Sequence, residues 1–319
     1  MDQRVTAPMH ESGLRIAVLV PCYNEELSIG KVVRDFRAAL PEAVIYVYDN
    51  NSKDRTAEVA REAGAQVALE TLQGKGNVMR RMFSDVEADV YVLVDGDDTY
   101  EATSAPVMIE QLLGQNLDMV TGTRVTQIAA AYRRGHRLGN AMLTGIVAAI
   151  FGDRVSDMLS GYRVFSRRFI KSFPALSSGF ETETELTVHA LELRMPLGEV
   201  ETPYRDRGKD STSKLNTYSD GWRILVTILV LVKEEKPLQF FTAAAGALFF
   251  AGVGLSIPIF LEFHRTHLVP RFPTAFLSLG MVLMSFLSLV CGLILDSVAR
   301  GRKEAKRMVY LGIPLHRVR

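Results

Sequence analysis

The stretch LRIAVLVPCYNEE, residues 14–26, decides the fold class of this chain. Its first seven residues are mostly apolar and typical of a buried strand, and they end at a proline that is soon followed by an amide and two acids. Such a change marks the carboxyl end of a strand, where α/β proteins gather their ligand-binding groups. A Rossmann dinucleotide site would need GxGxxG here, so binding of NAD or FAD is disfavoured.

Similar apolar runs recur through the first 125 residues, with amphipathic helix patterns between them. The further predicted strands are VIYVYD (44–49), AQVALE (65–70), VYVLVD (90–95) and DMVTGT (118–123). This alternation predicts an α/β fold, a Rossmann-like and mainly parallel sheet with helices on both faces. Because the carboxyl ends of parallel strands share one edge, the polar segments PCYNEE, DNNSKD and DGDD should converge there.

The segment DGDD, residues 95–98, is the candidate metal motif. Acids grouped at the end of an apolar strand repel one another unless a cation neutralises them, and carboxylate oxygens suit Mg²⁺ or Mn²⁺. The alternative is that these acids serve only as helix caps or solvated turn residues. The one glycine pair with a lysine, QGKGN at 73–77, lacks the GxxxxGK[ST] pattern, which disfavours a P-loop ATPase.

Two apolar runs, at about 238–263 and 274–295, are each long enough to span a bilayer as a helix. Only ten residues separate them, so they predict a transmembrane hairpin at 237–297, with a buried hairpin of a soluble protein as the alternative. The flanking segments are richer in Lys and Arg than the connecting loop, which predicts that both ends face the cytoplasm. Residues 216–236 have the pattern of an interfacial amphipathic helix, or alternatively of a core helix.

These assignments divide the chain into a globular domain at 1–215, the interfacial helix, the hairpin and a basic cytoplasmic tail at 298–319. The formal charge of +1 gives no indication of a nucleic-acid partner. Cys22 and Cys291 lie far apart in the sequence, one after a predicted strand and one within an apolar run, so neither a disulfide nor a zinc site is expected. With no apolar run before Leu14 to act as a secretory signal, we expect the globular domain to stay in the cytosol of a cell whose inner membrane holds the hairpin.

Taken in order, the strand-end motifs resemble the family 2 glycosyltransferases with a GT-A fold. The matching segments are PCYNEE at 21–26, YDNNSKD at 48–54, GKG at 74–76 and DGDD at 95–98. A later segment, VSDMLSGYRVFSRRF at 155–169, and the paired apolar tail resemble the dolichyl- or polyprenyl-phosphate glycosyltransferases of that family. One departure is Asn50, which stands where the family usually has a second acid, so Asp49 alone would provide a carboxylate for the nucleotide base there.

The resemblance implies a role for each motif. A nucleotide sugar would contact Pro21, Tyr23, Glu25, Asp49, Lys75, Asp95 and Gly96, and the metal would be held by Asp95 and Asp97. The acceptor phosphate would be bound by Arg124, Arg133, Arg134, Arg137 and Arg163. Arginine suits this role because its planar fork pairs with phosphate, although a basic rim that attracts anionic lipid headgroups is the alternative.

Two further segments carry expectations from the same resemblance. Asp157 would orient the acceptor or act as a base, and the alternative is a helix cap or an ion pair with Arg163. The polar segment 203–216 would close over the sugar donor's diphosphate, and the alternative is an ordinary solvated linker. Its expected contacts are Arg205, Lys209, Ser211 and Lys214.

The acids Glu181, Glu183 and Glu185 are interpreted from the sequence pattern as residues at the start of a helix, where negative charge interacts favourably with the helix dipole.

The implied activity is an inverting, metal-dependent transfer of one sugar from a UDP- or GDP-linked hexose or N-acetylhexosamine to polyprenyl phosphate, with Asp97, Asp157 and Arg124 as catalytic residues. Analogy with relatives also suggests a homo-oligomer such as a tetramer. A processive polysaccharide synthase is one alternative, although its QxxRW signature is absent and only GWRIL occurs. A silent membrane anchor that binds nucleotide sugar without turnover is the other alternative.

Overall fold

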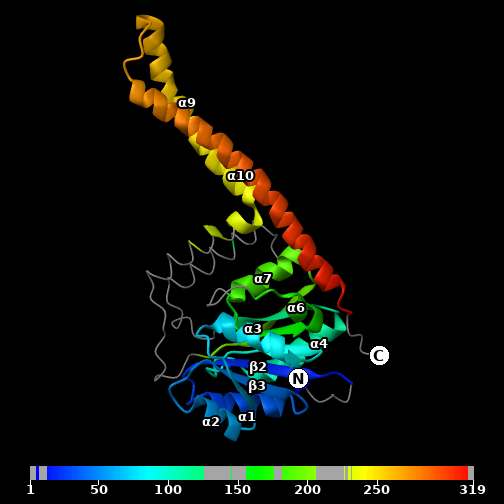
Figure 1. Cartoon of the computed structure of the whole chain (residues 1–319). Coiled ribbons are helices and arrows are strands. Elements are labelled where there is room, and N and C mark those ends of the chain that lie inside the picture. The colour runs from blue at the N-terminus through cyan, green and yellow to red at the C-terminus, as the bar shows by residue number, and fades with distance from the viewer. Residues whose placement is uncertain are drawn as a thin grey trace. The chain divides into compact units, whose positions relative to one another are not determined.

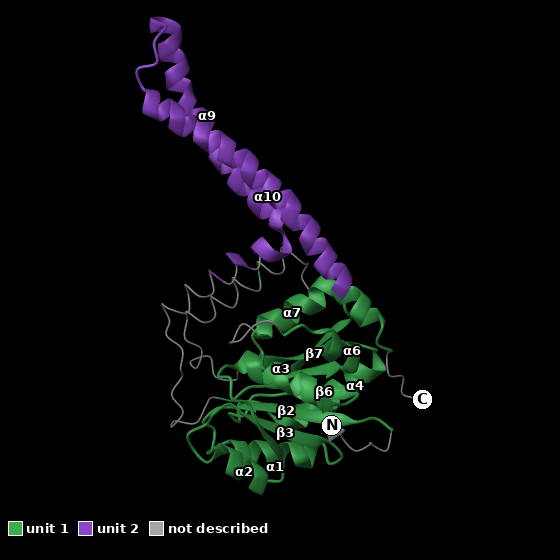
Figure 2. Cartoon of the chain, in the orientation of Figure 1, with its two compact units in different colours: residues 1–222, 306–319 green, residues 223–305 purple. Residues whose placement is uncertain are grey.

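The structure, a computed structural model, describes residues 5–6, 13–125, 156–175, 182–205 and 232–314, with isolated helical positions at 145, 226 and 229–230. The chain forms two compact units (Figure 2). The first contains residues 1–222 together with 306–319, and the second contains residues 223–305. The first unit is called the sheet domain below, and the apolar helices of the second unit are called the hairpin.

The sheet domain is built on a seven-stranded sheet of order β4-β3-β2-β6-β8-β7-β9. All neighbouring strands run parallel except β8, which is antiparallel to both of its neighbours. The strands are β2 (Ile16–Cys22), β3 (Val44–Asp49), β4 (Gln66–Leu69), β6 (Val90–Leu93), β7 (Met119–Val125), β8 (Arg163–Ser166) and β9 (Leu197–Pro203). A short parallel pair, β1 (Val5–Thr6) with β5 (Val86–Glu87), forms a separate sheet.

Helices cover both faces of this sheet (Figure 1). One face packs against α1 (Ile29–Ala39), α2 (Thr56–Glu62) and α4 (Ala105–Gly114), the last preceded by the short 3₁₀ turn η1 (Ala102–Ser104). The other face packs against α3 (Lys75–Asp85), α6 (Arg167–Ser172) and α7 (Thr182–Leu193). Strand β2 supplies Val18 and Val20 to the first core and Ala17 and Leu19 to the second, as the two-residue period of a strand requires.

The predicted α/β fold is confirmed, and the four further strands predicted from apolar runs occur as β3, β4, β6 and β7. The sequence did not predict that β8 lies between β6 and β7. Strand β8 pairs with β6 from Val90↔Ser166 to Leu93↔Arg163 and with β7 over three residue pairs. As a result, the segment that follows Asp157 is brought into the centre of the sheet, beside the strand that leads to the DGDD motif.

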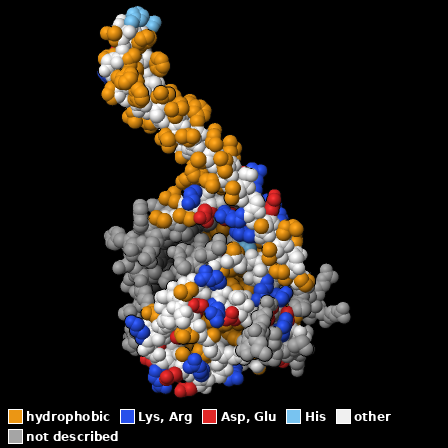
Figure 3. All heavy atoms as spheres, viewed as in Figure 1, with side chains coloured by type: hydrophobic (Ala, Val, Ile, Leu, Met, Phe, Trp, Pro, Cys, Tyr) orange, Lys and Arg blue, Asp and Glu red, His pale blue; other side chains and the backbone are white. Residues whose placement is uncertain are grey.

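The two apolar C-terminal helices are also present, as α9 (Pro237–Thr266) and α10 (Phe272–Leu311). Both are long and apolar enough to cross a membrane, and large apolar side chains are exposed along the hairpin (Figure 3). The two helices touch where Ser278 Oγ donates to the carbonyl of Gly252 at 2.7 Å and Ser288 Oγ to that of Phe241 at 3.2 Å. Of the predicted interfacial helix at 216–236, the structure describes residues 226, 229–230 and 232–236, and all of these except Lys236 are helical.

The last turns of α10 belong to the sheet domain and pack on it through a buried carboxylate, Asp118. Tyr310 Oη donates to Asp118 Oδ2 at 2.7 Å, Arg168 Nη2 donates to the same oxygen at 2.7 Å, and Ser166 Oγ donates to Oδ1 at 2.6 Å. The Arg168 guanidinium also lies 4.9 Å from the centre of the Tyr310 ring. Because Asp118 is fully buried, each of these hydrogen bonds offsets the cost of removing its charge from water.

We therefore expect Tyr310→Phe to lower the free energy of unfolding by about 1–2 kcal/mol, because it removes one hydrogen bond to a buried charge and keeps the ring. Thermal unfolding in detergent measures the change. Met308→Leu, at a position that is 72% exposed two residues away, is the matched control and should leave the midpoint unchanged. Equal midpoints for all three proteins would show that the Tyr310 hydroxyl contributes nothing.

Candidate active site

Polar segments from three strands meet at the carboxyl edge of the sheet. Strands β2 and β3 run parallel with Cys22 opposite Asp49, and the Asn50 N–H donates to the Cys22 carbonyl at 2.9 Å. Ser28 Oγ donates to the Gly96 carbonyl at 2.7 Å, which ties the segment after β2 to the segment after β6. A Cβ atom at Gly96 would lie 2.6 Å from Cys22 Sγ, so this close approach requires glycine.

At the centre of this edge, the ammonium group of Lys75 lies between two carboxylates. Lys75 Nζ is 2.6 Å from Asp95 Oδ1 and 2.5 Å from Glu183 Oε1. Lys75 begins α3, Asp95 follows β6 and Glu183 lies in the first turn of α7, so the cluster joins three elements. The Lys75 side chain is 13% exposed and that of Glu183 is 8% exposed, which makes the attraction stronger than at an open surface.

The electrostatics of the cluster favour a bound cation. Burial lowers the pKa of Lys75, but the charges of Asp95 and Glu183 outweigh burial and raise that pKa above its ordinary value. Burial raises the pKa of Asp95 and the charge of Lys75 opposes this, but with the nearby Asp97 and Glu183 the pKa stays above its ordinary value. The Lys75 ammonium therefore stays charged, and the carboxylates remain an attractive place for additional positive charge.

The predicted metal ligands Asp95 and Asp97 both follow β6 at this edge. Asp97 Oδ1 accepts hydrogen bonds from the hydroxyl of Thr99 at 2.6 Å and from its N–H at 3.3 Å, which orients the carboxylate. In the described part of the chain, no group of three or more His, Cys, Asp and Glu side chains is placed to hold a metal ion. The two carboxylates nevertheless fit Mg²⁺ or Mn²⁺, because these ions commonly take only one or two protein carboxylates and complete their shell with substrate phosphates and water.

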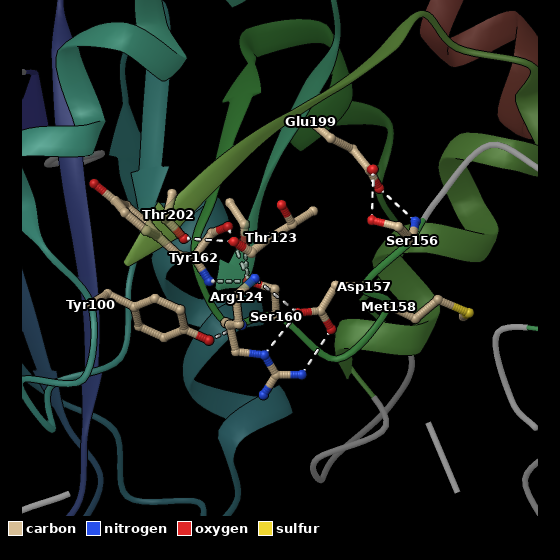
Figure 4. Close-up of polar contacts among 12 residues, drawn as sticks. Tyr100, Thr123, Arg124, Ser156, Asp157, Met158, Ser160, Tyr162, Glu199 and Thr202 are labelled. Carbon is tan, nitrogen blue, oxygen red and sulfur yellow. Dashed lines mark hydrogen bonds and ion pairs between the residues drawn. The ribbon is translucent and has the colours of Figure 1, made fainter. Parts of the chain in front are cut away.

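Arg124 and Asp157 form a bidentate ion pair (Figure 4). Arg124 Nε donates to Asp157 Oδ2 at 2.7 Å and Arg124 Nη2 donates to Oδ1 at 2.8 Å. Asp157 therefore pairs with Arg124 instead of the expected alternative partner Arg163. The guanidinium also lies 5.6 Å from the centre of the Tyr204 ring, so it is fixed from two directions.

This pairing bears on the choice between the two roles considered for Asp157. Burial raises the pKa of Asp157, but the hydrogen bonds and charge of Arg124 outweigh burial and hold that pKa below its ordinary value. A carboxylate that is held ionised with both oxygens occupied is a weak proton acceptor. The geometry therefore disfavours the role as a base, and it shows Asp157 orienting Arg124, the residue expected to bind the acceptor phosphate.

Arg163 lies in the interior and not on a ligand surface. It has no exposed surface, and its guanidinium donates to the carbonyls of Ser160 at 3.0 Å and Met158 at 2.5 Å and to Thr187 Oγ1 at 2.8 Å. Burial lowers the pKa of Arg163 to about 10. The expected contact with an acceptor phosphate is therefore corrected: in this structure Arg163 holds the loop 157–162 in place from within.

Gly161 brings that loop against the metal motif. A Cβ atom at this position would collide with the carboxylate of Asp95, so any other residue would displace the carboxylate. The Gly161 N–H donates to Tyr100 Oη at 3.0 Å, and Ser160 Oγ donates to the Gly122 carbonyl at 2.6 Å (Figure 4). The loop that carries Asp157 and the motif that carries Asp95 thus form one continuous site.

Asp49 has an unsatisfied oxygen in this site. The residue is 4% exposed, and its Oδ2 accepts a hydrogen bond from the Ser52 N–H at 3.2 Å, while Oδ1 has no partner among the described residues. A buried acceptor without a partner is costly, so this oxygen is suited to receive an N–H group from a ligand. The other residues expected to contact the nucleotide, Pro21, Tyr23 and Glu25, lie at the end of β2 and just after it and are all partly exposed.

Several expected ligand contacts lie outside the described residues, namely Arg133, Arg134, Arg137, Lys209, Ser211 and Lys214. Arg205 is described, and its N–H donates to the Thr99 carbonyl at 2.9 Å, two residues after Asp97. Its guanidinium forms an ion pair with Glu101. The start of the predicted diphosphate loop therefore lies next to the metal motif.

Glu183 is the site residue that the sequence interpretation missed. It was grouped with Glu181 and Glu185 as a helix-start acid, and nothing in the spacing of the three distinguishes one from another. In the structure Glu183 is 6% exposed and faces Lys75 from α7. The available signal was that α7 continues with Leu186 and other apolar residues, which indicates a buried helix whose acids need partners.

The sequence matches the family described as "Glycosyl transferase family 2" over residues 17–173. It is 30% identical over 296 residues to glycosyltransferase AglJ of Haloferax volcanii, covering 92% of this chain and 97% of that protein. The chain belongs to glycosyltransferase family 2. This glycosyltransferase is also 29% identical over 221 residues to a dolichyl-phosphate hexose transferase of the same organism, covering 69% of this chain and 95% of the relative.

Solved structures agree with the GT-A fold of this glycosyltransferase. Glucosyl-3-phosphoglycerate synthase from Mycobacterium tuberculosis, solved in complex with Mn²⁺, uridine diphosphate and glucosyl-3-phosphoglycerate, superposes with a TM-score of 0.58 at 22% sequence identity. The superposition covers 70% of this chain and 80% of the synthase. At this level of identity the likeness establishes the fold alone.

The contact between Gly161 and Asp95 generates a test of the site. We expect Gly161→Ala to weaken Mn²⁺ binding about tenfold, the usual cost of overpacking, because the new methyl group pushes the Asp95 carboxylate aside. Titration of Mn²⁺ in the presence of UDP or GDP, followed by electron paramagnetic resonance, measures the affinity. Gly114→Ala is the control, since no atom lies within 4 Å of a Cβ at that position. If the two variants bind Mn²⁺ alike, Asp95 does not hold the ion.

Proposed function

We propose that this glycosyltransferase moves one hexose or N-acetylhexosamine from a UDP- or GDP-sugar to polyprenyl phosphate, with inversion, at the cytoplasmic face of a membrane. The observation that carries the proposal is the contact of the Gly161 loop with Asp95. This contact brings together two parts of the site. One part has carboxylates suited to a metal ion that would bind the donor's diphosphate, and the other has an arginine suited to a phosphate acceptor. The same chain has two helices apolar enough to hold it at a bilayer, where such an acceptor resides.

On the sugar-donor side, the site supplies an acceptor atom for the base and positive charge for the diphosphate. Asp49 Oδ1, which has no hydrogen-bond partner among the residues that the structure describes, would accept an N–H from a nucleotide base, a group that both uracil and guanine carry. Lys75 would meet the diphosphate, and Glu183 would keep its ammonium in place once Asp95 engages another cation. A bound Mg²⁺ or Mn²⁺, held by Asp95 and Asp97, supplies Lewis-acid stabilisation of the charge that develops on the leaving diphosphate.

On the acceptor side, Arg124 is the described residue best suited to a phosphate. Asp157 binds Nε and Nη2 of its guanidinium, which keeps the plane of the group oriented. Arg133, Arg134 and Arg137 remain expected partners of the same phosphate. Arginine stays charged at any physiological pH and pairs with phosphate through more than one N–H, so the group would hold the acceptor without a proton transfer.

The reaction needs no strong base. A phosphate monoester loses its second proton with a pKa of about 6, so at neutral pH an ionised oxygen is already available as the nucleophile. That oxygen forms the new bond to the anomeric carbon while the bond from this carbon to the diphosphate oxygen breaks, and the electron pair leaves with the nucleoside diphosphate. In-line displacement on the opposite face inverts the anomeric configuration.

Two properties support the lipid acceptor over a soluble one. The hairpin exposes large apolar side chains along both helices, which matches a surface that contacts lipid. A relative that is 29% identical over 69% of this chain is named as a dolichyl-phosphate hexose transferase. Together with the basic flanks of the hairpin, these support a membrane-bound enzyme whose catalytic domain and termini face the cytoplasm.

The transfer reaction is tested with purified protein, undecaprenyl phosphate and a panel of radiolabelled UDP- and GDP-sugars. We expect label to enter the organic phase with Mn²⁺ or Mg²⁺ and not with EDTA. Asp97→Asn should lower the rate about 100-fold or more because it removes a metal carboxylate. Glu58→Gln, which changes an exposed carboxylate on α2 that pairs with Arg55, is the matched control and should retain the rate.

Failure of every sugar to label lipid, together with identical behaviour of the wild-type and Asp97→Asn proteins, would rule out carrier loading and favour the silent-anchor alternative. Label that enters a polymer larger than one sugar would favour the processive alternative.

Because the proposed reaction needs no protein side chain as a base, its rate should depend on pH through the acceptor phosphate. We expect the rate to rise as pH increases through about 6, the second pKa of the acceptor phosphate, and then to level off. Asp157→Asn should lower the rate because Arg124 loses its orienting partner, and it should leave the midpoint near 6 unchanged. A pH profile of transfer for both proteins measures this. A profile that becomes flat in Asp157→Asn would instead identify Asp157 as the titrating base.

A further inference from the structure

Asn50 directly follows β3, and both hydrogen-bonding atoms of its side chain are used. Nδ2 donates to the carbonyls of Glu70 at 3.0 Å and Leu72 at 2.7 Å. Oδ1 accepts from the Gly74 N–H at 2.7 Å and from Gln73 Nε2 at 3.4 Å. The residue is 4% exposed, so its amide is turned into the protein and binds the segment 70–74 instead of a ligand.

An acid could not replace this amide. Aspartate has the same shape, and its oxygen could still accept from Gly74, but it has no N–H groups to donate. A carboxylate oxygen in place of Nδ2 would face the Glu70 and Leu72 carbonyl oxygens, and the repulsion would push the segment 70–74 away. The amide at this position is therefore required for the contact between the end of β3 and the segment 70–74, which precedes α3.

The segment that Asn50 binds leads directly to Lys75. Gly74 has φ +130°, a backbone conformation that favours glycine, and it is the residue immediately before α3. Its carbonyl accepts the N–H groups of Asn77 at 3.0 Å and Val78 at 3.2 Å, which form the first turn of the helix. Since Asn50 holds the Gly74 N–H, it sets where α3 begins and hence where the Lys75 side chain starts.

We propose that Asn50 is a positioning residue that places the Lys75 ammonium for the diphosphate of the sugar donor, acting through Gly74 and not through contact with the nucleotide base. This inference rests on the proposed function for the identity of the ligand. The proposal gives the two neighbouring residues different roles. Asp49 Oδ1 has no partner among the described residues and would accept from the base, whereas the Asn50 amide binds the segment 70–74 that leads to Lys75.

The first test needs no ligand. Hydrogen–deuterium exchange of the detergent-solubilised full chain follows the amides of residues 71–77 in the wild type, in Asn50→Asp and in Asn116→Asp. Asn116 is exposed and follows α4, so its substitution makes the same chemical change away from the site. We expect exchange in this segment to rise at least about tenfold in Asn50→Asp only, because one or two hydrogen bonds are lost. Unchanged exchange would overturn the proposal.

The second test is a double-mutant cycle with Lys75→Met, read by titration with UDP and GDP in the presence of Mn²⁺. If Asn50 acts through Lys75, Asn50→Asp should weaken binding about tenfold in the wild-type background and should have little effect once Lys75 is replaced. UMP or GMP binding should change less than binding of the diphosphate. If the two substitutions weaken binding independently, Asn50 contacts the nucleotide itself and the proposal is wrong.

The two tests fail in different ways. A wild-type protein that binds neither UDP nor GDP would contradict the proposed function, whereas the exchange experiment would still decide whether Asn50 holds the Lys75 segment. Thermal unfolding of Asn50→Asp provides a check on general damage. Increased exchange that spreads through the sheet domain instead of staying at residues 71–77 would also overturn the positioning role.

Discussion

The site depends on one electrostatic constraint, which is that carboxylates brought together at the carboxyl edge of the sheet need positive charge between them. Lys75 meets this need by contacting Asp95 and Glu183 at 2.6 and 2.5 Å. Each of the three residues comes from a different element, so the positions of α3, β6 and α7 at this edge are coupled. An isolated acid in this environment would be neutralised or displaced, and the lysine keeps the edge charged and ready for a cationic ligand.

The elements around this cluster fix it from several sides. Gly161 lets the loop 157–162 lie directly against Asp95, and buried Arg163 holds that loop through the carbonyls of Met158 and Ser160. The Arg124 and Asp157 pair is thereby held close to the metal motif. Such prior organisation reduces the entropy lost when ligands are brought together in a site.

Asp118 is a buried carboxylate that directly precedes β7, whereas Arg124 lies near the end of that strand. Asp118 binds Arg168, Ser166 and Tyr310, so the last turns of α10 become part of the sheet domain. Asp118 and Asp95 thus illustrate two outcomes for an acid in the interior. Asp118 accepts hydrogen bonds from three side chains and is fully buried, whereas Asp95 shares the Lys75 ammonium with Glu183 and remains partly exposed.

Much of this protein is determined by its sequence alone. The two-residue alternation of β2, the apolar runs and the polar strand ends predicted the α/β sheet, its ligand-binding edge and the apolar helices, because these features depend on local periodicity and on the rule that parallel strands end together. Only the tertiary structure showed that β8 inserts between β6 and β7, that Glu183 and not its neighbours faces Lys75, and that Arg163 is buried. The tertiary structure also showed that the Asn50 side chain binds the segment 70–74. These outcomes depend on contacts between residues far apart in the chain, such as Lys75 and Glu183, and no local pattern records which of several similar side chains will meet.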